Sequence, residues 1–405
     1  MAKKKLYPLE FVPSVHEYEW GTEEWKLADM GFEDSEVKSG WLEGNTLSDV
    51  METYLERVTG DDVYKFYGRQ FPVLIKNLEV AGRMPVMVHP DDDTAMERYD
   101  ALGKVGFWYV TEAEDDAVLY LGFSREVSAQ EVFDRCNDGT IYEVLNAVSL
   151  HKGESYVIKP GTVYSASGHF KAVAVTESSD VNFILYDRSM AEADSETHFM
   201  HLSEAMDIIC YCRYGECHCH DHECHCGEEC HCGDECHCGD ECHCGGECHC
   251  HEHADEHHAH EGEVVSTLAE LPQFNVTRLD LSDPLHIYMD KFAGFIVYVC
   301  VEGEASVQAS LESGHMERYS VSKGEVLLVP AEMPDFYLVP SDRSTILLEV
   351  VTRPVDEFDE YIDPSTEAFL ENEDYEGLED EDDDDQDASG ASPLGFFGSM
   401  TKPVS

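Results

Sequence analysis

A repeated cysteine- and histidine-rich tract sets the strongest limit on how this chain can fold. The unit Cys-His-Cys occurs six times between residues 217 and 250, and the last five units begin six residues apart. Acidic residues with glycine or, in the first linker, histidine separate the units, so the tract has almost no apolar side chains with which to form a core. The tract therefore divides the chain into two folding blocks, one before it and one after it.

The repeat also places ligands for soft metal ions close together. Fourteen of the 16 cysteines lie between Cys210 and Cys250, and in a reducing compartment such crowding favours metal binding over disulfides. Residues i and i+2 of an extended chain share a face, so both thiolates of one unit can bind the same cation. We expect zinc, or another soft or borderline divalent metal, at these residues: Cys217, His218, Cys219, Cys224, His225, Cys226, Cys230, His231, Cys232, Cys236, His237, Cys238, Cys242, His243, Cys244, Cys248, His249 and Cys250.

Metal would supply the folding free energy of this insert, residues 210–263, which we expect to be disordered without it. The alternative is a low-complexity expansion that binds metal only incidentally.

The charge of the chain excludes two classes of partner. Lys and Arg total 26 against 85 Asp and Glu, a formal charge of -59 that would repel nucleic acids and anionic membranes alike. Residues 215–263 and 356–387 hold 33 of the 85 acidic residues and no Lys or Arg. We expect the acidic tail, residues 354–405, to be disordered. The lysines near the N-terminus precede no apolar segment of the kind that a secretory signal needs, which favours a cytoplasmic location.

Short apolar runs between turn residues predict a mainly β fold with a few helices. In the first block, residues 6–209, strands are predicted at 71–78, 85–89, 106–110, 117–123, 155–158, 172–176 and 181–186, and a helix at 47–58. In the second block, residues 264–353, strands are predicted at 274–281, 294–301, 305–310, 325–329 and 345–351. Many short strands with few helices are typical of sandwiches and barrels.

Both blocks contain the same short phrase. Lys152-Gly-Glu and Lys323-Gly-Glu each precede an apolar run that ends in a proline-led turn, at Pro160 and Pro330. Each phrase predicts a hairpin corner in which glycine adopts a positive φ. We therefore expect two tandem jelly-roll units of the cupin (RmlC-like) kind.

A series of motifs in the first block resembles one enzyme family. The motifs, in chain order, are Phe71-Pro-Val-Leu-Ile-Lys76, Val88-His-Pro-Asp-Asp92, Gly103-Lys104 with Trp108-Tyr109, Leu119-Tyr-Leu-Gly-Phe123, Lys152-Gly-Glu, Lys159-Pro-Gly-Thr-Val163, Ser178-Ser-Asp180 and Tyr186-Asp187. As a set they are similar to the short bacterial form of the class I mannose-6-phosphate isomerases. That resemblance implies a cupin pocket in which zinc polarises a sugar-phosphate carbonyl while a base moves a proton.

The chain departs from the family at the positions that carry the chemistry. The family holds zinc with a Gln and a His of Gln-Val-His-Pro, a Glu of Gly-Lys-Thr-Glu and a His of Gly-Thr-Val-His. Here only His89 remains, because Met87, Gly106 and Tyr164 stand at the other three positions. Ile184 stands where the family has a catalytic arginine. A catalytic zinc needs about three protein ligands, so a zinc ion in this pocket is doubtful.

These departures predict a catalytically degenerate family member whose insert binds or sequesters metal. Two alternatives remain open: an active isomerase of carbohydrate metabolism, in which His151 or His169 replaces a missing ligand, and a sugar-phosphate-responsive regulator. Lys76 and Lys104 match family positions and could still attract a sugar phosphate. The phrase around His89 has a purely structural interpretation as well, in which Pro-Asp-Asp caps the next helix.

Overall fold

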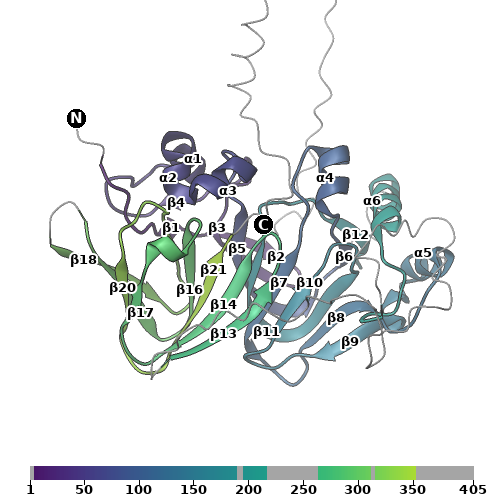
Figure 1. The fold of residues 1–405 in the computed structure, drawn as a ribbon. Helices are drawn as coiled ribbons and strands as arrows, with labels where there is room; N and C mark the ends of the chain where they lie inside the picture. Colours follow the sequence, from purple (N-terminus) through teal and green to yellow (C-terminus); the bar gives the residue numbers. More distant parts are fainter. Residues whose placement is uncertain (1–3, 189–194, 217–262, 312–314, 353–405) are drawn as a thin grey trace, which may run out of the picture.

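The computed structural model describes residues 4–188, 195–216, 263–311 and 315–352 of the chain. It is mainly β, and its strands form two units that lie side by side with a group of helices above them (Figure 1). Most of the predicted insert and the whole of the predicted tail fall outside the described residues. Among the described residues, no helix is both long enough and apolar enough to cross a membrane.

The N-terminal unit is built on one curled ten-stranded sheet. Its strands are β2 (Ser14–Tyr18), β3 (Gly21–Leu27), β5 (Val73–Arg83), β6 (Val86–Val88), β7 (Gly106–Ala113), β8 (Val118–Phe123), β9 (Leu145–Ser149), β10 (Ser155–Ile158), β11 (Tyr164–Glu177) and β12 (Phe183–Tyr186). The long strand β11 organises the unit, since it pairs antiparallel with β5 and β7 through its second half and with β6 and β8 through its first. Two further strands, β1 (Phe11–Val12) and β4 (Glu36–Val37), pair beside it.

The C-terminal unit is a sandwich of two antiparallel sheets. One sheet runs in the order β13 (Glu263–Glu270), β14 (Asn275–Leu281), β21 (Thr345–Val351), β16 (Ile296–Glu302) and β19 (Val326–Val329). The other runs in the order β15 (Leu285–Ile287), β20 (Phe336–Pro340), β17 (Glu304–Ser310) and β18 (Met316–Ser322). Alternate residues of both sheets point inward, and the resulting core includes Tyr298 and Phe336. Both units have the cupin-like architecture that the sequence predicts.

The predicted helix at 47–58 is wrong in one respect, because it is broken. Helix α1 (Leu47–Tyr54) ends at Leu55, whose φ of 49° starts a new direction, and α2 (Glu56–Thr59) follows. The break turns the last carbonyls of α2 toward the second unit, where Thr59 accepts a hydrogen bond from the Phe295 amide at 3.2 Å. Contacts from the other unit therefore override the helical periodicity at this point. The remaining helices are α3 (Asp61–Tyr67), α4 (Asp92–Tyr99), α5 (Ala129–Asp138) and α6 (Ser195–Ile208), with short 3-10 turns at Ile141–Glu143 and Met289–Lys291.

The two units share a hydrophobic core. One continuous cluster joins buried residues of α1 to α3 and β5 with residues of β14, β16 and β21, including Phe71 and Phe295, whose rings are 4.6 Å apart. An ion pair between Arg57 and Glu332 closes the polar edge of this contact. Burial of this much apolar surface makes the contact between the units part of the folded core.

The repeated Lys-Gly-Glu phrases form equivalent turns, as predicted. Gly153 and Gly324 have φ values of 89° and 82°. In each turn the glutamate side chain accepts the amide of the residue before the lysine, at 2.9 Å in both. Each lysine crosses to the other unit: Lys152 binds Glu302 at 3.0 Å, and Lys323 binds Glu112 at 3.4 Å.

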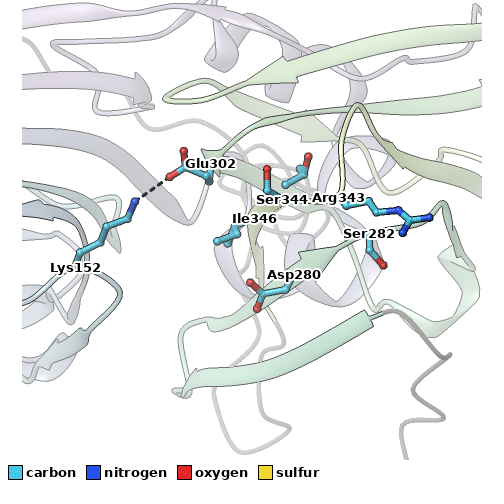
Figure 2. A pocket seen from close by; sticks show the side chains of 8 residues that line it. Lys152, Asp280, Ser282, Glu302, Arg343, Ser344 and Ile346 are labelled. Carbon is cyan, nitrogen blue, oxygen red and sulfur yellow. Dashed lines mark hydrogen bonds and ion pairs between the residues drawn. The ribbon is translucent and has the colours of Figure 1, made fainter.

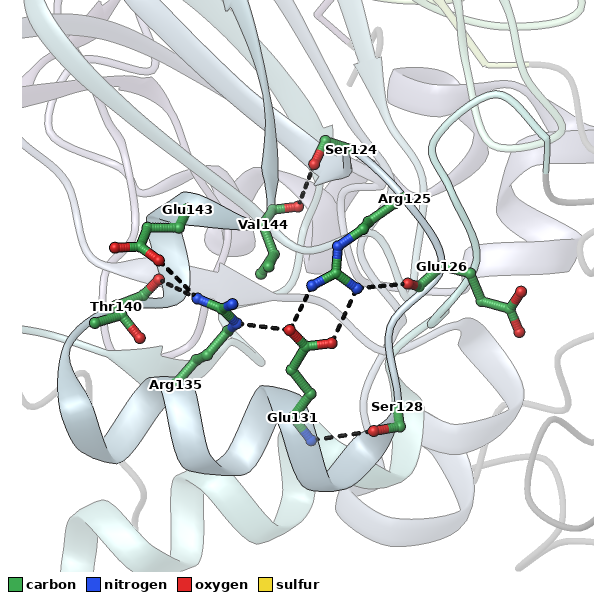
Figure 3. A network of polar contacts seen from close by, with 9 residues as sticks. All are labelled: Ser124, Arg125, Glu126, Ser128, Glu131, Arg135, Thr140, Glu143 and Val144. Atoms are coloured by element: carbon green, nitrogen blue, oxygen red, sulfur yellow. Dashed lines mark hydrogen bonds and ion pairs between the residues drawn. The ribbon is translucent and has the colours of Figure 1, made fainter.

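Helix α5 is held on the surface by a network of charges (Figure 3). Ser128 caps its first turn by accepting the Glu131 amide at 3.2 Å. Hydrogen bonds from Arg125 and then Arg135 lower the pKa of Glu131 to about 2. The network faces solvent, so it fixes the helix against its loop and contributes little else.

Candidate functional site

His89 lies at the inner end of β6 and is almost fully buried, with 3% of its surface exposed. The chain turns directly after it: Asp91 accepts the Thr94 amide at 2.8 Å and caps α4. The predicted helix cap is therefore confirmed. The turn holds the imidazole inside the N-terminal unit.

Tyr164 occupies the space beside the His89 ring. It is the first residue of β11, and it pairs with Met87 of β6 across the sheet. Its hydroxyl lies 2.7 Å from His89 Nε2 and 4.0 Å from the Met87 sulfur. Burial raises the pKa of the Tyr164 phenol far above its usual range, so the hydroxyl stays protonated and forms a hydrogen bond with Nε2.

Apolar side chains enclose this pair. Met87 and Tyr164 belong to one hydrophobic cluster with Trp108, whose ring meets Tyr164 edge to face at 6.1 Å. Ile184 of β12 stands opposite Met87 in the sheet and packs against the same cluster. In the resembled family these positions carry zinc ligands and the catalytic arginine. Here Met87, Tyr164 and Ile184 pack in one apolar cluster instead.

Two buried lysines approach the same interior. Lys76 of β5 binds Glu23 of β3 at 3.0 Å and lies over the Trp25 ring at 4.8 Å. Burial would raise the pKa of Glu23, but the charge and hydrogen bond of Lys76, the hydrogen bond from Trp25 and the charge of Lys104 together lower it. Lys104 forms no ion pair and no side-chain hydrogen bond in the part of the chain that the structure describes. Burial, followed by repulsion from Lys76, lowers the pKa of Lys104 to about 7.

Glu177 is the second acid of this interior, and it has a structural partner. Its carboxylate accepts the Val105 amide at 2.8 Å and so ties the end of β11 to the segment before β7. Burial, and then the charge of Asp92, raise the pKa of Glu177 well above its usual range.

The residues around His89 do not fit a zinc ion. Burial, followed by the charges of Lys104 and Lys76, lowers the pKa of His89 and keeps the ring neutral, which zinc requires. Its Nε2, however, is hydrogen-bonded to the Tyr164 hydroxyl, and the neighbouring ligand atoms would be a protonated phenol and a thioether. Zinc prefers imidazole, thiolate and carboxylate ligands, and the two nearby lysines would oppose a divalent cation. No step of chemistry through a metal follows from this arrangement.

Neither alternative histidine replaces a missing ligand. His169 lies on the outer part of β11, is 55% exposed, and bonds Asp116 through Nδ1 at 2.8 Å. His151 is exposed in its turn and contacts Glu154. Glu114, Asp116 and His169 are close enough to hold a cation on the surface, yet they do not belong to the interior around His89. The idea that a neighbouring histidine rebuilds the pocket is therefore wrong.

Sequence reasoning brought some of these residues together and missed others. It placed His89, Tyr164, Lys76, Lys104 and Ile184 in one vestigial pocket, and the structure puts them in the interior of one unit. It did not single out Glu23 or Asn182, whose amide reaches the Met87 sulfur at 3.0 Å. No motif marks these two residues, because only the sheet pairing brings them there. The metal ligands predicted between Cys217 and Cys250 lie outside the described residues.

The two β units define a protein with two cupin-like units, and comparisons with known proteins show what it is similar to. No model of a protein family matches the chain. The chain is 24% identical over 350 residues to mannose-6-phosphate isomerase ManA of Bacillus subtilis. This match covers 82% of this chain and 95% of ManA. It is 29% identical over 187 residues to the protein named "Probable mannose-6-phosphate isomerase GmuF" of the same organism, a match that covers 46% of this chain and only 57% of GmuF.

Solved structures agree on the fold. The mannose 6-phosphate isomerase of Bacillus subtilis superposes with a TM-score of 0.64 at 20% identity, covering 85% of this chain and 99% of that one. A variant of phosphomannose isomerase from Salmonella typhimurium gives a TM-score of 0.58 at 14% identity over 86% of this chain. In sequence and in fold the chain is similar to mannose-6-phosphate isomerases.

Proposed function

We propose that the two cupin-like units form a catalytically inactive scaffold and that the Cys-His-Cys insert is the part of the protein that binds metal. The observation that carries the first half is the Tyr164 hydroxyl on His89 Nε2, inside an apolar cluster. The hydroxyl engages Nε2 of His89, which is the one residue that the chain shares with the family zinc site. The second half rests on the density of thiolate and imidazole ligands between residues 217 and 250.

A coupled assay with mannose 6-phosphate tests the inactive scaffold. We expect turnover far below the roughly 10 per second that is typical of enzymes, with or without added zinc. Turnover within about tenfold of that value would contradict the proposal.

Restoring the family residues provides the matched gain-of-function variant. Met87→Gln, Gly106→Glu, Tyr164→His and Ile184→Arg together should bind one additional zinc and recover measurable activity. A side chain can be built at Gly106, since a Cβ there would meet Ile158 at an ordinary contact distance of 3.5 Å. Wild-type activity equal to that of this variant would show that the present residues suffice for catalysis.

The competing function is a working isomerase, which the name of ManA favours because ManA matches the chain over most of both lengths. The same assay separates the two functions. If the wild type is active, Tyr164→Phe and His89→Gln should then change kcat, whereas an inactive scaffold has no kcat to change.

A further inference from the structure

Two cysteines that do not belong to the Cys-His-Cys repeat lie on the folded N-terminal unit. Cys210 and Cys212 follow helix α6, which ends at Ile208, and they precede the first unit of the repeat. The structure describes both residues, and both side chains are thiols. They form a Cys-x-Cys pair on a defined part of the fold.

Backbone hydrogen bonds hold this pair against the rest of the unit. The Cys210 amide donates to the Gly161 carbonyl at 2.9 Å, and the Tyr211 carbonyl accepts the Val127 amide at 3.1 Å. Arg213 then pairs with the last residue of β8 in an isolated β-bridge. Because the backbone is bonded on both sides of the pair, the fold positions the two cysteines before any ligand binds, which lowers the entropy cost of binding.

The side chains of this segment alternate between the core and the opposite side. Ile209 is 4% exposed, and Tyr211 packs against the same hydrophobic cluster and donates its hydroxyl to the Met206 carbonyl at 2.7 Å. Successive residues of an extended chain point to opposite sides, so Cys210 and Cys212 both point away from this cluster. Both are half-buried. The two thiols therefore share one side of the segment, where an ion can reach them from solvent.

The described residues supply two ligands at this position and no third. In the described part of the chain, the one group of three His, Cys, Asp or Glu side chains close enough to share a metal ion is Glu114, Asp116 and His169. Zinc is almost always bound by four ligands, so two thiolates are too few for it. Copper(I) is a soft ion that thiolates select, and two thiolates in line satisfy its coordination. The pair therefore suits copper(I) rather than zinc.

The acidic residues between the two units do not offer a competing site for a soft ion. They line an open groove beside the Lys152 turn, where Lys152 binds Glu302 at 3.0 Å (Figure 2). Asp280 of the same groove accepts two hydrogen bonds from Arg278, at 2.7 and 2.9 Å. Both carboxylates already bind cationic side chains, and none of the residues that line the groove is a cysteine.

We propose that Cys210 and Cys212 form a copper(I) site on the N-terminal unit. Each thiol releases its proton as its sulfur binds, so one copper(I) ion replaces two protons and no electron is transferred. The site contains no residue of the repeat. It adds a second metal to the proposed function, with a different charge and coordination number, and it does not depend on zinc binding by the repeat.

Copper(I) titration against the chelator bicinchoninate tests the site in the full-length chain. The starting protein carries serine at the twelve cysteines of the six Cys-His-Cys units, so the repeat contributes no thiolate. Under anaerobic, reducing conditions we expect this protein to take up one copper(I) ion per chain. Cys210→Ser and Cys212→Ser should each weaken that binding at least about tenfold, because each removes one of two ligands.

A matched control and a spectrum complete the test. Cys300→Ala also removes one cysteine, but this thiol is fully buried in the core of the C-terminal unit, so we expect unchanged copper(I) affinity. X-ray absorption of the copper-loaded starting protein should find two sulfur ligands per copper, a result that needs no further variant.

Three results would overturn the proposal. One is a starting protein that takes up no copper(I); if the wild type still binds several zinc ions, the proposed function stands without this site. Another is a bound copper(I) that survives loss of both Cys210 and Cys212. The third is an absorption spectrum dominated by nitrogen ligands, which would place the copper on histidines. Copper(I) held by the pair in a chain whose repeat binds no zinc would instead support this site and contradict the proposed function.

Discussion

Removing the Tyr164 hydroxyl tests whether the former pocket is now a packed structural core. Tyr164→Phe keeps the ring against Trp108 and deletes only the group that bonds His89 Nε2 at 2.7 Å. Both residues are buried, with 5% and 3% of their surfaces exposed, so water cannot replace the lost donor. A buried acceptor left without a partner costs about 1–3 kcal/mol. For a protein of this size that corresponds to a fall in melting temperature of roughly 2 to 5 °C.

Urea unfolding with a chelator present measures this cost without a contribution from metal in the insert. The control is Tyr288→Phe, because the Tyr288 side chain is 43% exposed; we expect a change within about 0.5 kcal/mol. The reasoning fails if Tyr164→Phe is as stable as the wild type. It also fails if the variant becomes more stable when zinc is added and this gain requires His89, because the hydroxyl would then have been blocking a working metal site.

Three further outcomes follow from other parts of the molecule. Gly60→Ala should lower the free energy of unfolding by about 2–4 kcal/mol, because Gly60 has a φ of 92° and a Cβ would lie 2.4 Å from the Ala293 carbonyl oxygen of the second unit. The control Gly31→Ala, where φ is 73° and the surrounding space is open, should lower it by about 1–2 kcal/mol. Equal losses for the two variants in calorimetry would contradict the shared core. Burial raises the pKa of Asp29 to about 6, so ionisation of this carboxyl disfavours the folded state above that pH. Asp29→Asn should therefore be more stable than the wild type at pH 7.5, by on the order of 1–3 kcal/mol, and should lose this advantage near pH 4. A constant stability difference between the two proteins in chemical unfolding across that pH range would refute the assignment. Zinc held by the insert should be released as pH falls from 7 toward 5, because thiolates and neutral imidazoles must both bind protons; a competition assay that finds the same affinity at both pH values would argue against thiolate ligands.

Local sequence patterns carried much of the fold. Every strand predicted from apolar runs overlaps a strand of the structure, and the two Lys-Gly-Glu turns adopt the same geometry because glycine and a local glutamate determine it. The first half of β11 was missed, because Tyr164 to Lys171 consists mostly of small and polar residues with no apolar period. Its strand conformation depends on pairing with β6 and β8, which local patterns do not encode.

The contacts that define the site were harder to predict for the same reason. The family motifs located Tyr164 and His89, but not the hydrogen bond between them, since that depends on the register of β6 against β11. The break at Leu55 depends on contacts with the second unit.

The most direct test of the account is the zinc content per chain of the full-length protein and of a variant in which residues 217–262 are replaced by a short Gly-Ser linker. The replacement begins at 217 because Tyr214 is part of the N-terminal unit, with its amide on the Phe123 carbonyl at 2.8 Å. The account predicts several zinc ions per full-length chain, loss of most of them when the twelve cysteines of the Cys-His-Cys units become serine, and fewer than one per chain in the linker variant. One zinc retained in the linker variant and lost on His89→Ala would contradict it, because the cupin interior would then hold the metal.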